Sequence, residues 1–368
     1  MEKPDFAKYS ESQLRQILTR IDKERFPDRV AEIHALLARM EAERPARIGT
    51  SETVPDDGPA RIAGFWRRAG AFMIDVLVLA LLGHLLGLFL QDQFEALDAW
   101  GRALGLVIAL AYFGTMESDV FQGRTFGKHA LDIKVVAADG TPLALGKALL
   151  RSATFCIPYF LNNVNVGSAS GNIVFGTIQS LLVFGLGGAI VYLCLFNRRT
   201  RQSVHDLLVN AAVVRAETTN APDLQPVWNG HLAVVATWFA LATGVVIYGY
   251  SAVAHGALQP LMRVQQQVGT LTGVHSAGVF RGTSYLPGDK RVDYLSVNAV
   301  TNVNTSAEWA LARRIADTTF ATYPAALELE TFSVTLMHGY DIGIASSWST
   351  RTYNGSPGAW RDGSVPHH

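Results

Sequence analysis

The sequence predicts a mainly α, polytopic helical membrane protein with an N-terminal cytoplasmic helical hairpin and a small C-terminal α+β domain outside the membrane. Three observations predict this fold class. Charged residues make up only 17% of the 368 residues, against about a quarter in soluble domains. The apolar residues gather in blocks, several of which exceed the ~18 residues that cross a bilayer. The polar ends of the chain carry helical and strand-like patterns of their own.

The overall composition argues against several classes of protein. Lys and Arg number 31, and so do Asp and Glu, so the net charge is zero and no nucleic-acid partner is expected. The first residues are polar and lack the apolar core of a secretory signal. Cys156 and Cys194 both lie in apolar blocks, which indicates two buried thiols rather than a disulfide or a redox site. No cofactor or metal is expected.

Residues 1–44 predict two amphipathic helices that pair as a cytoplasmic helical hairpin. The pattern begins at 10–13 with a capping box, in which two side chains satisfy each other's free amides. Apolar residues then recur on one helical face over 14–21, and a second stripe follows over 30–40. Residues 45–60 contain three prolines and two glycines and are expected to form a linker.

The central part of the chain predicts a transmembrane domain over residues 61–216, followed by a linker at 217–230 and an additional transmembrane helix at 231–254. Arg67 and Arg68 precede the first span, so the positive-inside rule places the N-terminus in the cytoplasm. The spans expected within the domain are about 69–90, 100–116 and 171–196, with a less regular candidate at 149–166.

The candidate at 149–166 decides the number of crossings. The basic loops at 117–151 and 197–216 are both expected inside, which requires an even number of crossings between them. The segment contains Arg151 and Pro158, and it is either a second crossing or a re-entrant, interfacial segment. We favour a crossing, which gives an odd total and places the C-terminus outside.

Residues 256–368 predict the extracytoplasmic α+β domain. Residues 292–300 are strand-like, and a capping pattern at 305–308 opens a helix that reaches about residue 320. Alternation of apolar and polar residues predicts a strand over 327–336, with a partner strand over 342–353.

Asp75 lies inside the first apolar run, where an ionisable residue usually faces the bundle interior and marks a pathway or a partner. Arg68 lies seven residues earlier, on the same helical face but about 10 Å away along the axis. This is too far for a direct bond, so Asp75 is expected to find its partner on another segment. Its role is either that of a protonatable carboxylate in an ion pathway or that of a structural group paired with a basic residue.

Two further stretches carry residues that could take part in chemistry. In FQGRTFGKHALDIKVVAADG a short strand is expected from Ile133, with a tight turn at Asp139-Gly140. Gly127-Lys128 lacks the spacing of a phosphate-binding loop. In RQSVHDLLVNAAVV, His205-Asp206 follows an arginine cluster and indicates a helix or turn at the inner membrane surface. No companion ligand supports a metal site there.

Taken in order, these stretches resemble the RDD family of bacterial membrane proteins, which is named for one arginine and two aspartates. Those positions match Arg68, Asp75 and Asp206, and the resemblance covers about residues 58–216. The supporting positions of the family motif match Gly123, Gly127, Lys128, Arg151 and His205. Asp132 stands where the family usually has a glycine and Ala211 where a threonine is common, which concerns the loop conformation rather than membership.

The resemblance implies a multi-pass protein of the bacterial inner (cell) membrane. Transport of an unidentified small ligand has been suggested for the family, and cation–proton antiport for some members. On this hypothesis Asp75 alternates between a proton and a monovalent cation, Arg68 tunes it, and Asp206 lies near the inner mouth. The lipid bilayer, monovalent cations and protons are the expected partners, and a homo-oligomer could supply further helices.

The alternative hypothesis is a non-transporting membrane scaffold or sensor that links the cytoplasmic hairpin to the external domain. Arg68, Asp75 and Asp206 would then form a structural charge network. An enzyme is not expected, because the sequence carries no nucleophile–base pair or cofactor fingerprint of useful strength, and no catalytic residue is assigned.

Overall fold

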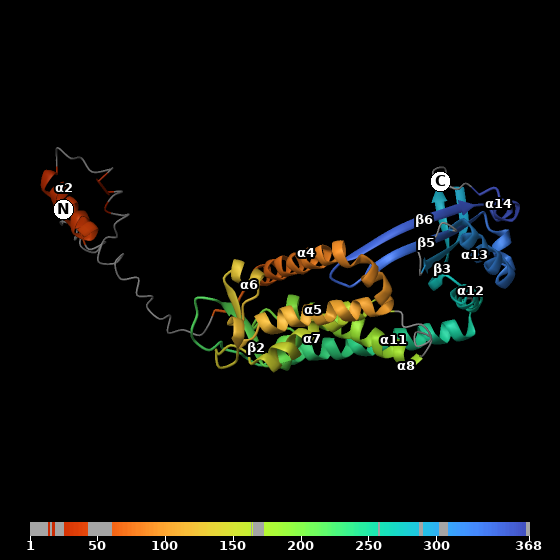
Figure 1. Cartoon of the computed structure of the whole chain (residues 1–368). Coiled ribbons are helices and arrows are strands. Elements are labelled where there is room, and N and C mark those ends of the chain that lie inside the picture. Colours follow the sequence, from red (N-terminus) through yellow and green to blue (C-terminus); the bar gives the residue numbers. More distant parts are fainter. Residues whose placement is uncertain are drawn as a thin grey trace. The chain divides into compact units, whose positions relative to one another are not determined.

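The computed structural model describes residues 14, 17–18, 26–42, 61–162, 164, 173–256, 258–286, 290–301 and 308–365 (Figure 1). The chain divides into two compact units, Met1–Gly58 and Pro59–His368.

The first unit contains α2 (Pro27–Ala42). Leu14 and Ile33 are fully buried in one small apolar cluster, with Ile17, Leu18, Leu36 and Leu37 packed around them. These residues come from the two stripes that were expected to face each other. The capping box at 10–13 and the linker at 45–60 lie outside the described residues.

The second unit is built on long apolar helices. They are α4 (Phe65–Leu97), α5 (Gly101–Met116), α7 (Leu145–Leu161), α8 (Ile173–Ser180), α9 (Gly187–Phe196) and α11 (Asn229–His255). A π-helical segment, η5 (Leu181–Leu186), joins α8 to α9, so that the two form one continuous helix. The prediction of a mostly helical chain is confirmed.

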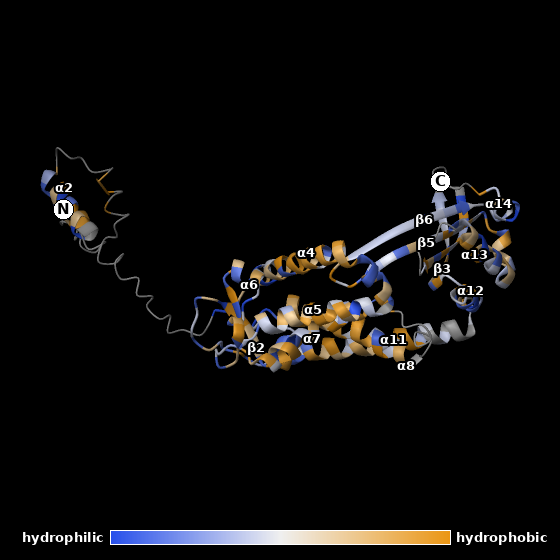
Figure 2. Cartoon of the chain, viewed as in Figure 1, coloured by the Kyte–Doolittle hydropathy of each residue, from blue (hydrophilic) through white to orange (hydrophobic). Residues whose placement is uncertain are grey.

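Three of these helices are long and apolar enough to cross a membrane, namely Phe65–Leu97, Val174–Phe196 and Asn229–Gly249. Hydrophobic residues dominate them in Figure 2. Large apolar side chains stand exposed on their surfaces, among them Leu77 and Phe89 on α4 and Val245 on α11. A helix that is apolar on all faces and exposed in this way is suited to lipid.

Short elements gather at one end of the helices, and we call them the cap. They are η3 (Asp119–Phe121), α6 (Phe126–Ala130), β1 (Ile133–Ala137), α10 (Val204–Leu208) and β2 (Ala211–Arg215). β1 and β2 pair antiparallel, with Ile133 opposite Arg215. The strand at Ile133 and the helix at His205-Asp206 confirm the sequence prediction. β2 was not predicted, because AAVVR follows α10 with no Gly or Pro turn signal between them.

The C-terminal domain is a four-stranded sheet with helices, which confirms the α+β prediction. Its strands are β3 (Val274–Leu286), β4 (Lys290–Thr301), β5 (Thr331–Asp341) and β6 (Ser346–Gly355), in the spatial order β3-β4-β5-β6. β4 and β5 are parallel, and the other neighbours are antiparallel. The remaining elements are α12 (Gln259–Gly269), α13 (Glu308–Thr322), η6 (Pro324–Glu328) and α14 (Pro357–Asp362).

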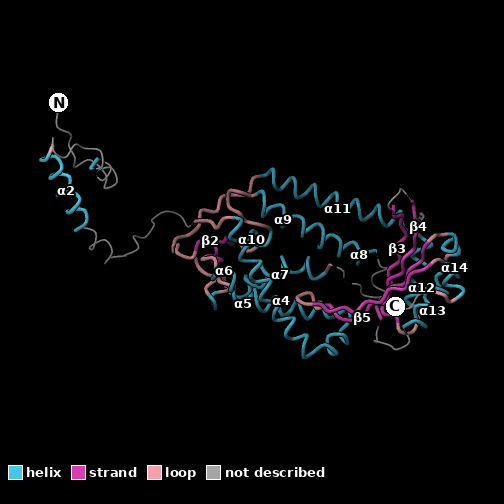
Figure 3. Tube along the Cα trace, turned by 90° about the horizontal axis from the view of Figure 1, so that it is seen from above, coloured by secondary structure: helices cyan, strands magenta, loops and turns pink. Residues whose placement is uncertain are grey.

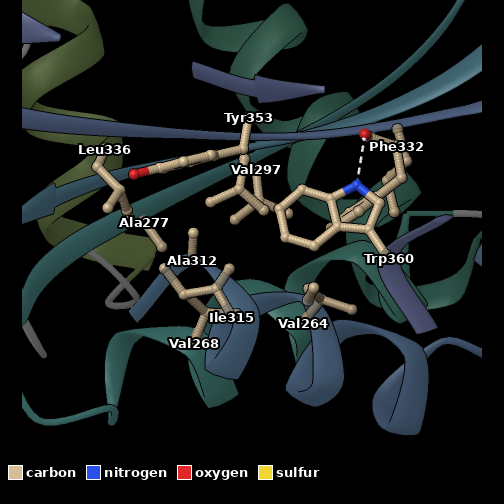
Figure 4. Close-up of a cluster of buried hydrophobic side chains, with 14 of the residues drawn as sticks. Val264, Val268, Ala277, Val297, Ala312, Ile315, Phe332, Leu336, Tyr353 and Trp360 are labelled. Atoms are coloured by element: carbon tan, nitrogen blue, oxygen red, sulfur yellow. Dashed lines mark hydrogen bonds between the residues drawn. The ribbon is translucent and has the colours of Figure 1, made fainter. Parts of the chain in front are cut away.

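Apolar residues of the sheet, α12, α13 and α14 form the core of this domain (Figure 4). Trp360 lies at its centre, and its indole N–H donates to the carbonyl oxygen of Phe332 at 3.0 Å. Neither β3 nor α12 was predicted.

Two predicted strand boundaries were wrong. The strand expected over 327–336 begins at Thr331, because Pro324–Glu328 forms a 3-10 helix. The partner expected over 342–353 begins at Ser346, because Ile342 and Ala345 close the hairpin turn through a backbone hydrogen bond. The capping pattern at 305–308 lies partly outside the described residues, and α13 begins at Glu308.

The β5–β6 hairpin packs on α4 and α5 on the side away from the cap, and Ile344 and Ala345 at its tip reach Gly83 near the middle of α4 (Figure 3). Tyr340 and Ile342 of the hairpin are buried in one cluster with Phe94 of α4. Gly105 of α5 allows the close approach, since a Cβ atom there would lie 1.7 Å from the carbonyl oxygen of Ile342. Arg102 adds an ion pair with Asp341 at 2.7 Å. The C-terminal domain is therefore seated on the helices rather than tethered by α11 alone.

Candidate functional site

Asp206 is the centre of a group of buried charges in the cap. Its carboxylate accepts from the backbone N–H of Ser203 at 3.1 Å, which closes the capping box of α10. Arg68 of α4 donates to one carboxylate oxygen at 2.7 Å. Arg151 of α7 donates to the other from Nε at 3.0 Å and from Nη2 at 2.7 Å. One fully buried carboxylate thus joins α4, α7 and α10.

Glu117 extends this group. It directly follows α5 and is 1% exposed. One of its oxygens accepts from Arg151, and the other accepts from the ammonium of Lys128 at 2.6 Å. We call the five residues Arg68, Glu117, Lys128, Arg151 and Asp206 the charge cluster. They come from five different parts of the chain and form a continuous series of ion pairs.

Both carboxylates of the charge cluster are held in the ionised form. Burial alone would raise the pKa of Asp206, but the contacts with His205, Arg151 and Arg68 outweigh it and lower the pKa well below its usual range. Burial likewise acts to raise the pKa of Glu117, and Arg151 and Lys128 outweigh it and lower the pKa. Removing one partner from such a group leaves a buried charge uncompensated.

Asp75 belongs to a separate set of hydrogen bonds. Its side chain is fully buried and accepts from the Tyr112 hydroxyl at 2.6 Å, the Thr125 hydroxyl at 2.6 Å and the backbone N–H of Gly127 at 2.8 Å. The expectation of a partner on another segment is met. The expectation that a structural Asp75 would pair with a basic residue is wrong, since the three donors are two hydroxyls and one amide. Arg68 is directed to Asp206 instead.

Residues 62–210 match the model of the RDD family. The chain contains an RDD family domain. The match covers the charge cluster, Asp75 and the donors that surround it, which gives the three residues of the family name a place in the fold. A comparison with curated proteins found no match.

The loop glycines of the RDD domain bring the cap against α4. A Cβ atom on Gly127 would lie 1.9 Å from the carbonyl oxygen of Ala71, so only glycine lets α6 approach Asp75 closely enough to donate. Gly123 has a φ of +71° and accepts from the amide of Val135 at 2.9 Å. The structure thus brings Gly127 to Asp75, and Arg151 and His205 to Asp206. Lys128 joins this group through Glu117, whereas Gly123 packs against Val135 of β1.

The two departures from the family pattern are accommodated. Asp132 has a φ of +51°, in the left-handed region that glycine favours and that aspartate tolerates better than most residues. Its carboxylate is exposed and pairs with Arg124 at 3.3 Å. Ala211 is fully buried, and its carbonyl oxygen accepts from the Gln202 side chain at 2.8 Å.

Three residues of the site were missed in the sequence. Glu117 is the first charge after the second apolar run and resembles the start of a solvated loop. Tyr112 and Thr125 are polar groups with no spacing that links them to Asp75. The one available signal was position: Glu117 ends an apolar helix and is followed by a loop rich in Lys and Arg.

A cavity of about 430 Å³ lies beside the charge cluster. Arg68, Lys128, Arg151 and Glu117 line one part of it. Aromatic and aliphatic side chains of α4, α5, α7 and α9 line the rest, including Phe72, Phe113, Phe155, Val191, Cys194 and Leu195. Cys194 is a free, half-buried thiol, and Cys156 is free and buried. Among the described residues, no group of three His, Cys, Asp or Glu side chains could hold a metal ion.

We expect Asp206→Asn to destabilise the RDD domain by about 3–5 kcal/mol, because Arg68 and Arg151 would lose their shared buried counter-charge. The measurement is thermal or denaturant unfolding of the purified full chain in detergent. Asp132→Asn is the matched control. Its side chain is 80% exposed, and loss of an exposed ion pair costs about 0–1 kcal/mol. Equal losses of unfolding free energy in the two variants would contradict a stabilising role for Asp206.

We also expect acid to weaken the cap through His205. Burial lowers the pKa of this imidazole to about 4, against the opposing attraction of Asp206. In the unfolded chain the pKa is about 6.5, so between these values only the unfolded chain binds the proton. The contribution to stability is complete above pH ~6.5 and falls as the pH drops towards ~4, by up to about 3 kcal/mol.

The measurement compares unfolding at pH 7.5 and pH 4.5 for the wild type, His205→Gln and His84→Gln. The first substitution should reduce the loss of stability in acid. The second removes an exposed histidine of α4 and should leave the loss unchanged. An unaltered pH dependence in His205→Gln would show that another group is responsible.

Proposed function

We propose that the chain is a multi-pass protein of the bacterial inner membrane whose RDD domain serves as a non-catalytic scaffold or sensor. In this proposal the domain joins a cytoplasmic cap to an external α+β domain, and its arginine and aspartates hold the structure together. The observation that supports this proposal most directly is the hydrogen bonding of the buried Asp75 carboxylate. Its fully buried carboxylate is engaged by three donors at 2.6–2.8 Å.

Engagement of this kind supports a structural role. A carboxylate that exchanges a proton for a cation must offer each of them an oxygen lone pair, and three of the about four acceptor sites of Asp75 are already used by these donors. Thr125 and Gly127 belong to the start of α6, so Asp75 fastens the cap to α4. Releasing them would free the cap as well as the carboxylate, which favours a constant contact over a cycling one.

The packing of α7 supports an odd number of crossings. α7 runs antiparallel to α5, with Arg151 bonded to Glu117 near one end. Near the other end, Arg102 donates to the carbonyl oxygen of Tyr159 at 3.2 Å. α7 therefore lies at the same depth as α5, and in our proposal it crosses the membrane with it. Buried packing makes Pro158 tolerable inside the helix. The five crossings are α4, α5, α7, α8–α9 and α11.

Contacts of the C-terminal sheet with α4 and α5 support a coupling between the external domain and the transmembrane helices. His338 of β5 lies 3.1 Å from Glu95, and His275 of β3 lies 2.7 Å from Asp98. With the Arg102–Asp341 pair, these contacts tie the sheet to the outer ends of α4 and α5. A load or ligand on the external domain would thus act directly on the helix that carries Arg68 and Asp75.

Transport is the second candidate function, either of an unidentified small ligand or as cation–proton exchange. The cavity beside the charge cluster favours it, because this space extends from the surfaces of apolar helices to Arg68 and Glu117. Ion flux through the protein separates the two candidates.

We expect liposomes that contain the wild-type protein to show no more proton flux than empty liposomes when a sodium or potassium gradient is applied. Asp75→Asn should show the same background flux. Its free energy of unfolding should fall by about 1–3 kcal/mol, because an NH2 group replaces one carboxylate oxygen and then faces another hydrogen-bond donor. A pH-sensitive dye inside the liposomes measures the flux. Asp92→Asn, an exposed position on the same helix, is the control. Wild-type exchange that disappears in a folded Asp75→Asn variant would establish transport.

For the topology, we expect alkaline phosphatase fused after Pro366 to be active, because five crossings place the external domain outside the cytoplasm. The same reporter fused after Asp139, in the exposed turn that follows β1, should be inactive. Activity after Asp139, or none after Pro366, would overturn the assigned sidedness.

A further inference from the structure

The cavity beside the charge cluster has two chemically different parts. Phe72, Phe113 and Phe155 form one wall, with ring centroids 5.0–6.4 Å apart. Val191, Cys194 and Leu195 of α9 also line the apolar part. The charged side chains lie together at the cap end. A space with one apolar part and one ionic part is suited to a molecule of the same build.

We place the opening of the cavity between α4 and α9, because exposed residues of both helices line it. These two helices share no extended packing, because α4 packs mainly on α5, α6 and the hairpin. At the opening, Phe72 is 48% exposed and Leu195 is 41% exposed. Both stand on helices that are long and apolar enough to cross a membrane. The opening therefore faces the hydrocarbon, and a ligand reaches it from within the bilayer.

The charged part of the cavity carries an excess of positive charge. Three cationic side chains line it, from Arg68, Lys128 and Arg151, against the single carboxylate of Glu117. Asp206 lies behind the two guanidinium groups and neutralises one of them, so the charge cluster has three cations and two anions. Asp75 lies outside the lining and is engaged by neutral donors.

Lys128 is the group best placed to hold a ligand. Its ammonium has three N–H donors, and among the described residues its one hydrogen-bond acceptor is Glu117. The side chain is 11% exposed. Although Glu117 pairs with this ammonium, its spare N–H donors favour an anionic ligand, because buried donors are costly to leave without hydrogen-bond partners.

We propose that this cavity binds an acidic amphiphile of the membrane, with an acyl chain in the apolar part and a monoanionic headgroup at Lys128 and Arg68. The volume of about 430 Å³ lies within the range of about 300–1,000 Å³ typical of sites for one small molecule. One excess positive charge matches one negative charge. A zwitterionic headgroup would place its own cation beside three others. Binding of this kind does not depend on whether the helices carry ions.

Two sources share this chemistry, a free fatty acid and an anionic phospholipid. The experiment adds oleate, dioleoyl phosphatidylglycerol or dioleoyl phosphatidylcholine to the purified full chain in detergent and measures the bound fraction by native mass spectrometry. We expect one acidic amphiphile per chain, bound at least tenfold more tightly than phosphatidylcholine. Binding of oleate alone identifies the fatty acid as the source, and binding of phosphatidylglycerol identifies the phospholipid.

Two substitutions test the two parts of the cavity separately. Lys128→Met should reduce the affinity for the acidic amphiphile at least tenfold and leave that for phosphatidylcholine unchanged, while Glu117 keeps Arg151 as its partner. Cys194→Trp should block the apolar part and leave the charge cluster intact. Ile178→Trp, exposed on α8 and outside the cavity, is the matched control and should bind as the wild type does.

Unfolding in detergent checks that each variant is folded, and Cys194→Trp alone decides the matter if Lys128→Met does not assemble. Equal binding of phosphatidylcholine and phosphatidylglycerol, with no binding of oleate above them, would overturn the proposal. Wild-type affinity for the acidic amphiphile in folded Cys194→Trp would overturn it as well.

Discussion

The buried ion pairs around Asp206 are the interaction on which the rest of the RDD domain depends. In lipid, apolar helices gain little by touching one another, because the acyl chains offer equivalent contacts. α4 illustrates this, since it shares only short stretches of packing with the other helices. Its position is fixed instead by Arg68 in the charge cluster, by the three donors to Asp75 and by the hairpin contacts from Gly83 to Phe94. The polar contacts of Arg68 and Asp75, together with the hairpin, thus specify an arrangement that the lipid-facing surfaces of the helices leave open.

The two aspartates of the family name make different kinds of contact. Asp206 collects guanidinium groups and joins helices to the cap, and it stays ionised because cations surround it. Asp75 collects neutral donors and fixes the start of α6 against α4. Gly127 is the condition for the second contact, because any side chain there would meet the backbone of Ala71. Ion pairs therefore hold α10 of the cap, and close packing at Gly127 with hydrogen bonds to Asp75 holds α6.

The sequence predicted the elements whose signals are local and missed those that depend on distant partners. Apolar length marked α4, α8–α9 and α11, and the resemblance marked Arg68, Asp75 and Asp206. It did not indicate that Arg68 would pair with Asp206 rather than serve Asp75, since no spacing encodes a contact across so much chain. Glu117 was missed for the same reason, because it resembles the end of a helix until its partners from other segments are known.

The separation between Arg68 and Asp206 has a consequence for biosynthesis. The two residues are 138 positions apart, so during synthesis the guanidinium is made long before its carboxylate exists. In the topology that we propose, Arg68 stays at the cytoplasmic face of the membrane, where water solvates it, while α5, α7 and α8–α9 are inserted. Only the emergence of α10 supplies the counter-charge that lets the cap close. Closure of the cap is thus a late event of assembly, and a chain that stops before residue 206 leaves two arginines and a lysine with one carboxylate between them.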